Sequence, residues 1–143
     1  MSSSANTAAR RERINNDVRT LRSRRDDNIL ESRRFMRQID ELDSVIPRLE
    51  NCINDQIQIE RQVERCHNVV PTSAFAGRRR RQTDRRLENS CERVKREIRR
   101  HQQNLERLRT VRNNLQGRLD TLQLNIQNQN QRIDTLVADL RNL

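Results

Sequence analysis

A run of arginines near the middle of the chain has the clearest chemistry in the sequence. The guanidinium group keeps its charge in proteins and forms forked hydrogen bonds to carboxylates and phosphates. We therefore expect this basic patch to bind an acidic protein partner. It consists of Arg78, Arg79, Arg80, Arg81, Arg85 and Arg86.

A nucleic acid is the alternative partner, because arginines also neutralise backbone phosphates without reading sequence. The chain has only two aromatic residues, Phe35 and Phe75, so stacking platforms for bases are not interleaved with the arginines. Glu88, Glu92 and Glu97 also interrupt the basic face that follows the patch. An acidic protein partner, or salt bridges within the chain, is therefore the favoured interpretation.

Catalytic and metal-binding patterns are not recognisable in the sequence. It contains no Gly-rich phosphate loop, no GxSxG and no HExxH, and His67 and His101 stand apart from any nucleophile. Cys66 precedes His67, but no second ligand pair with suitable spacing follows. We expect a non-enzymatic protein without cofactor or metal.

The cysteines and the apolar content predict the cellular setting. The chain has three cysteines, Cys52, Cys66 and Cys91. They form no CxxC pair, and an odd number is not typical of a disulfide framework, which favours a reducing intracellular compartment such as the cytoplasm or nucleus. No apolar run approaches the roughly 20 residues that cross a bilayer. We therefore expect no membrane insertion.

A heptad ladder through the second half of the chain predicts a long helix, which carries the basic patch. Steps of four and three residues from Leu87 to Leu143 meet apolar residues at fourteen of seventeen positions, where 31% apolar content would give about five. An α-helix places such a repeat on one narrow stripe, which another helix buries. The three polar members are His101, Arg112 and Gln129.

The first half carries a weaker ladder, so the two halves are expected to pack on each other. We expect its breaks at Arg25, Asn28 and Ser32, and again near Gln56 and Glu60, to let the contact face drift as stutters do. The predicted helix–helix interface comprises Ile39, Leu42, Ile46, Leu49, Ile53, Leu87, Val94, Ile98, Leu105, Leu108, Leu115, Leu119, Leu122, Ile126, Ile133, Leu136 and Leu140. Its centre is expected to set Leu105–Ile126 against Ile39–Leu49.

The predicted boundaries follow from the turn residues. Residues 1–10 read as a polar N-terminal tail and residues 11–67 as a first long helix with a kink near Pro47. Residues 68–77, with Pro71 and Gly77, form the hairpin loop, and residues 78–143 form the second long helix. Arms of nearly equal length around one loop favour an antiparallel hairpin.

Charge supports this orientation. Residues 38–77 carry a net charge of −4 and residues 78–100 a net charge of +7, so folding at the loop lays opposite charges side by side. In a simple register, His101, Arg112 and Gln129 fall opposite mostly apolar residues. They then either set register and oligomeric state or extend to water.

The loop residues Phe75-Ala76-Gly77 resemble the Trp-x-Gly turn of small helical-hairpin proteins handled by type VII secretion. The resemblance implies a helical hairpin and an exported partner protein. Phe75 replaces the Trp, and a clear aromatic-x-x-x-acidic export signal is not found near the C-terminus.

Together these patterns predict an all-α, elongated antiparallel two-helix hairpin, a coiled coil that assembles into a helical bundle. Because each ladder has one partner and polar residues interrupt it, we expect a homo-oligomer or a helical hetero-complex. The predicted function is a scaffold subunit that acts by helix-on-helix assembly, with a basic nucleic-acid-binding architectural protein as the alternative.

Overall fold

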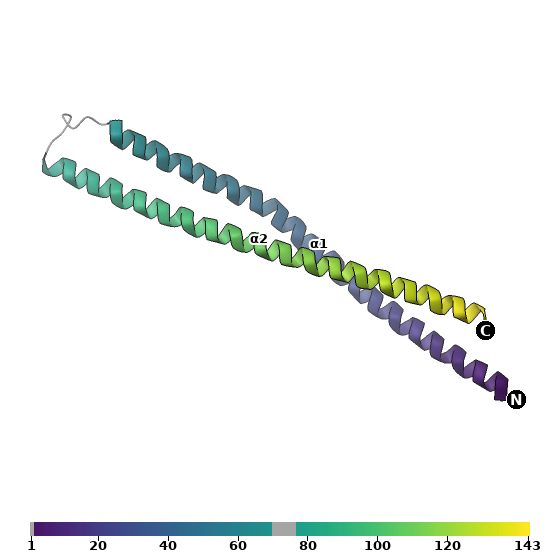
Figure 1. The fold of residues 1–143 in the computed structure, drawn as a ribbon. Helices are drawn as coiled ribbons and strands as arrows, with labels where there is room; N and C mark the ends of the chain where they lie inside the picture. The colour runs from purple at the N-terminus through teal and green to yellow at the C-terminus, as the bar shows by residue number, and fades with distance from the viewer. Residues whose placement is uncertain (1, 70–76) are drawn as a thin grey trace. The chain divides into compact units, whose positions relative to one another are not determined.

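The computed structural model describes residues 2–69 and 77–143, and the side chains of residues 3–66 and 77–143. Two α-helices, α1 (Ser2–Val69) and α2 (Arg78–Arg141), account for nearly all of these residues, and no strand occurs among them (Figure 1). The chain has only two Gly and two Pro, so little interrupts backbone hydrogen bonding along either helix. The predicted all-α fold is confirmed.

The first helix starts earlier than the sequence suggested. We expected residues 1–10 to form a separate polar tail, but residues 2–10 belong to α1. This segment contains no Gly or Pro, and Ala5, Ala8, Ala9 and Arg10 are strong helix formers. Because extending an existing helix costs far less than starting one, the polar segment continues the helix that follows it.

Glycine starts the second helix. Gly77 has φ 91°, a left-handed conformation that other residues rarely adopt, and its carbonyl accepts a hydrogen bond from the Arg81 N–H at 3.2 Å. At the other end, α2 stops at Arg141, and the Asn142 N–H donates to the Ala138 carbonyl at 3.2 Å.

Two boundary predictions concern residues around the loop. The predicted loop spans residues 68–77, but Asn68 and Val69 belong to α1, and residues 70–76 lie outside the described residues. Pro47 lies inside α1 and does not end it. The kink near Pro47 stays a prediction.

The chain divides into two compact units, each built from a segment of α1 and a segment of α2. Unit 1 contains Met1–Asp40 and Asn113–Leu143, and unit 2 contains Glu41–Arg112. In both, the paired segments run in opposite directions (Figure 1): ion pairs in unit 2 join Glu64 to Lys95 and Glu50 to Arg109. The predicted antiparallel helical hairpin is confirmed, while its assembly into a bundle stays a prediction.

The side chains described for unit 1 form two buried clusters. In the first, Ile14 and Val18 of α1 pack with Ile133 and Leu136 of α2. In the second, Phe35 and Ile39 of α1 pack with Leu119 of α2, and Leu115 and Leu122 lie against them.

The described residues of unit 2 form one such cluster, in which Ile53 of α1 packs with Ile98 and Leu105 of α2. Ile46, Leu49, Ile57 and Val94 are partly buried against these three residues. No described side chain in either unit is completely buried. A contact surface between only two helices is open along both edges, so it shields its side chains from solvent less than a globular core would.

Candidate functional site

The contact surface between the helices, which we call the seam, follows the heptad ladder of α2. Every ladder position from Leu87 to Leu143 is buried or half-buried. Among the predicted interface residues, the buried ones are Ile39, Ile53, Ile98, Leu105, Leu119, Ile133 and Leu136. The half-buried ones are Leu42, Ile46, Leu49, Leu87, Val94, Leu108, Leu115, Leu122, Ile126 and Leu140.

The opposing sets within the seam fall in different units. Ile39 packs in unit 1 with Leu119, against which Leu115 and Leu122 also lie. Ile46 and Leu49 pack in unit 2 against the cluster that contains Leu105. Ile53 lies two heptads after Ile39, and Leu105 lies two heptads before Leu119, so ladder residues pair within each unit in the same heptad phase.

Two polar ladder residues have polar partners, which corrects the expectation that they face mostly apolar residues. The Arg112 Nε donates to Asp43 Oδ1 at 3.0 Å, and the Asn28 amide donates to Gln129 Oε1 at 3.2 Å. Asp43 raises the pKa of Arg112 above its ordinary value, mainly through this hydrogen bond. These pairs satisfy groups that would otherwise cost free energy at the seam.

The contact face of α1 does not drift at its first break, contrary to our expectation. Ser32 stays buried and donates from its hydroxyl to the Ile29 carbonyl at 2.9 Å. Arg25, also on the ladder, donates to Asn130 of α2 at 3.2 Å. The neighbouring Leu30, which a drift would bring inward, is 63% exposed. A buried hydroxyl bonded to its own backbone costs little, so the heptad register continues through the break.

His101, the third polar ladder residue, is half-buried in unit 2. The register of the seam places Gln56 of α1 opposite it. Gln56 Oε1 is buried without a hydrogen-bond partner among the described atoms. A buried acceptor without a donor is destabilising at this position.

Ion pairs close one flank of the seam in unit 2. Lys95 Nζ lies 3.3 Å from Glu64 and 3.5 Å from Glu60, and Arg109 lies 2.7 Å from Glu50. Glu64 first, and then Glu60, raise the pKa of Lys95 above its ordinary value. Glu50, and then Glu106 in its own helix, do the same for the pKa of Arg109. The two bridges lie two heptads apart on both helices, which fixes the antiparallel register.

Five of the six arginines in the basic patch form no ion pair with a described residue of α1, although acidic residues of α1 were considered as their partners. Arg80 is half-buried and lies 3.2 Å from Asp84, one turn along α2. Arg78, Arg79, Arg81, Arg85 and Arg86 are exposed. The acidic residues that do pair across the seam use Lys95, Arg109 and Arg112, which lie further along α2.

An exposed line of arginines continues from the basic patch along α2. Its members are seven residues apart, so they share one face of the helix about 10.5 Å from one another. We call this set the arginine row; it consists of Arg79, Arg86, Arg93, Arg100 and Arg107. All five are exposed, and none forms an ion pair with a described residue. Sequence reasoning grouped the first arginines by adjacency and missed this seven-residue period, which was visible in the sequence.

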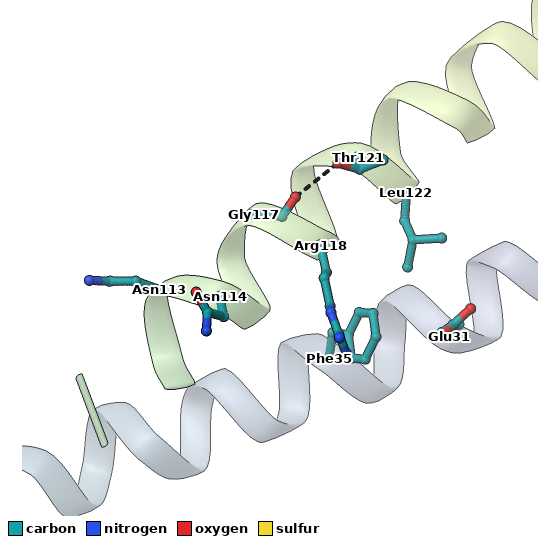
Figure 2. A pocket seen from close by; sticks show the side chains of 8 residues that line it. All are labelled: Glu31, Phe35, Asn113, Asn114, Gly117, Arg118, Thr121 and Leu122. Atoms are coloured by element: carbon teal, nitrogen blue, oxygen red, sulfur yellow. Dashed lines mark hydrogen bonds between the residues drawn. The ribbon is translucent and has the colours of Figure 1, made fainter. Parts of the chain in front are cut away.

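A shallow groove of about 620 Å³ lies on the surface of unit 1. Figure 2 shows Arg118 of α2 extending toward the ring of Phe35 on α1, and the Thr121 hydroxyl donating to the Gly117 carbonyl at 3.0 Å. Asn113, Asn114, Glu31 and Leu122 complete the lining. Such an open surface, in which polar and apolar groups are mixed, suits contact with another protein better than enclosure of a small molecule.

Neither a metal-binding cluster nor a membrane span occurs among the described residues. No cluster of three or more His, Cys, Asp or Glu side chains there could hold a metal ion. Neither described helix has a segment long and apolar enough to span a bilayer. Comparisons with protein-family models, curated proteins and solved structures find no match to the chain.

Proposed function

We propose that the protein is a non-enzymatic scaffold subunit that acts by helix-on-helix assembly and engages an acidic helical partner through the arginine row. The observation that carries this proposal is the exposure of all five row arginines without ion pairs to described residues. The acidic residues of unit 2 that pair with α2 use other cations, so the row keeps its charge for another molecule.

The spacing of the row favours a helical partner over an irregular acidic chain. Row arginines repeat about every 10.5 Å along α2. A helix with Glu or Asp at every seventh position presents carboxylates at the same interval, and each can accept a forked hydrogen bond from one guanidinium. The partner chemistry is therefore an α-helix with a heptad-spaced acidic face.

The start of α2 strengthens the positive potential at one end of the row. Arg78–Arg81 occupy its first turn, which contains no acidic residue. The N-terminus of a helix already carries a partial positive charge, so this arrangement is locally unfavourable unless an anion lies nearby. An acidic partner relieves this repulsion.

The test compares two helical peptides of identical composition, one with Glu at every seventh position and one with the same Glu residues shuffled. Fluorescence anisotropy at physiological salt should show tighter binding of the heptad-spaced peptide. The triple variant R86Q/R93Q/R100Q should lose most of this binding. R19Q/R22Q/R37Q, which removes three exposed arginines of α1, should retain it. Equal affinity for both peptides, or equal loss in both variants, would contradict the proposal.

A nucleic acid is the second candidate, and the same row favours it. Row arginines could contact successive phosphates, and Arg96 and Arg99 add charge beside them. Filter binding of duplex and single-stranded nucleic acid across a salt series discriminates the two functions. Affinity that persists near physiological salt and falls on Arg-to-Gln changes at residues 78–81 would favour nucleic acid over a helical partner.

The resemblance to type VII secretion partners rests on Phe75-Ala76-Gly77. Of these three residues only Gly77 lies within the described part of the chain. That resemblance stays a prediction.

A further inference from the structure

The flank of α1 opposite the ion pairs carries a second apolar line in unit 2. Val45, Cys52, Ile59 and Cys66 recur every seven residues, and all four are exposed. Val45 is 46% exposed and Ile59 is 56% exposed. We call these four residues the second stripe. The other exposed residues of α1 between Glu41 and Cys66 are polar or charged, apart from Pro47.

Of the two flanks of α1 in unit 2, one is covered by ion pairs and the other carries the second stripe. Asp43, Glu50 and Glu64, on the first flank, form ion pairs with cations of α2. The second stripe has no such cover, since both of its large apolar side chains remain about half exposed. A line of apolar residues at seven-residue spacing is half of the pattern that packs one helix on another.

The other half of the pattern is charged and self-complementary. Arg48 lies three residues after Val45, and Asp55 lies three residues after Cys52, which is the stepping of the seam itself. Both are exposed, and neither forms an ion pair with a described residue. If a second α1 lies antiparallel with the two Cys52 residues opposite each other, Val45 meets Ile59 of the second copy. Arg48 then meets Asp55 of the second copy, and each of these pairs occurs twice.

We propose that the second stripe is a homodimer interface on which α1 of a second copy packs antiparallel, with the two-fold axis at Cys52. The interface is isologous, because the same patch of each chain contacts its counterpart. This proposal rests on the proposed function and names a second copy of the chain as one partner in assembly. The charge pairs select the antiparallel orientation, while Val45 and Ile59 supply the apolar burial.

The position of the second stripe lets the hairpin and the dimer coexist. With 100° between successive residues, the second stripe and its charged neighbours lie about 110° around α1 from the seam. A second copy therefore packs beside α1 without displacing α2. The Asp43, Glu50 and Glu64 ion pairs on the other flank remain intact.

Sedimentation equilibrium, with circular dichroism as the folding control, tests the interface. The chain should form a dimer at roughly micromolar to hundred-micromolar concentration. R48E and D55R should each raise the dissociation constant roughly tenfold or more, because each creates two repulsive contacts. The double variant R48E/D55R should restore dimerisation. V45N/I59N should abolish it, and L124N, at a leucine that is 56% exposed in unit 1, should leave it unchanged.

Cysteine cross-linking tests the register. Oxidised glutathione takes two electrons and two protons from a pair of thiols and leaves as two reduced molecules. A chain that keeps only Cys52 (C66S/C91S) should give a disulfide-linked dimer. A chain that keeps only Cys66 (C52S/C91S) should not, because the register separates the two Cys66 residues by 28 positions.

Three results would overturn the dimer: equal cross-linking of the two single-cysteine chains, no recovery in R48E/D55R, or a folded monomer at all concentrations. None of them touches the arginine row, so binding of the heptad-spaced acidic peptide would still stand. A failure of the dimer is thereby distinguished from a failure of the proposed function.

Discussion

Two leucines of α2, five residues apart, give a matched test of the seam. Leu119 is 5% exposed and packs with Phe35 and Ile39, whereas Leu124 is 56% exposed. Leucine to alanine removes three carbon atoms, each worth about 0.8 kcal/mol when buried. Scaled by the buried share of each side chain, L119A should cost about 2.3 kcal/mol and L124A at most about 1 kcal/mol.

The opposing effect of helix propensity is the same at both positions, because alanine replaces leucine in the same helix. Thermal unfolding followed by circular dichroism at 222 nm should show a midpoint lowered by about 5–9 °C for L119A. The shift for L124A should be less than half as large. Equal shifts would refute the packing of Leu119 against α1, since an isolated α2 helix exposes both leucines.

Three further changes test the polar groups of the two units. Lys95 is the only lysine, and the chain has no tyrosine. Glu64 and Glu60 raise the pKa of Lys95. The stabilisation that Lys95 gives the folded chain is therefore complete at neutral pH and is lost as the pH rises above about 10. In a C52S/C66S/C91S background, the unfolding temperature should fall from pH 7 to 11.5, and in K95R this fall should be absent. The same dependence of the unfolding temperature on pH with Lys95 and with Arg at this position would contradict the pairing. N28L and Q129L should each destabilise unit 1 by about 1–2 kcal/mol in urea unfolding, and the double variant should cost less than the sum of the two. Additive losses would show that the two amides are not coupled. Q56L should stabilise the chain by about 1 kcal/mol, because it removes a buried acceptor without a donor, whereas Q58L at an exposed position should change stability by less than about 0.5 kcal/mol.

The heptad ladder of α2 was sufficient to predict the all-α hairpin. The stepping from Leu87 to Leu143 placed every ladder residue on the buried side, because a 3.5-residue repeat has only one face in a helix. Few Gly and Pro residues also allowed the long helices to be expected. The N-terminal boundary was missed because helix propagation carries a polar segment, residues 2–10, along with the helix that follows it.

The partners of the polar ladder residues could not be derived from one helix alone. Whether Gln129 meets Asn28 or an apolar neighbour depends on the register between α1 and α2, and a slip of one residue changes every partner. For the same reason the sequence left open whether the arginines form salt bridges within the chain. In the structure, Glu64 and Glu50 of α1 pair with Lys95 and Arg109. The seven-residue spacings of the arginine row and of the second stripe were visible in the sequence, but their exposure became known only with the structure.

Pulsed electron–electron double resonance tests the antiparallel pairing of the helices most directly. In the cysteine-free background, spin labels at exposed Gln58 and Arg99 report on unit 2, and labels at exposed Leu30 and Gln127 report on unit 1. Because packed helix axes lie 8–10 Å apart, both pairs should give distances within about 30 Å. These distances should be unchanged when labelled protein is diluted with unlabelled protein. Distances beyond about 50 Å, or a signal that vanishes on dilution, would show that the two helices of one chain do not pack on each other.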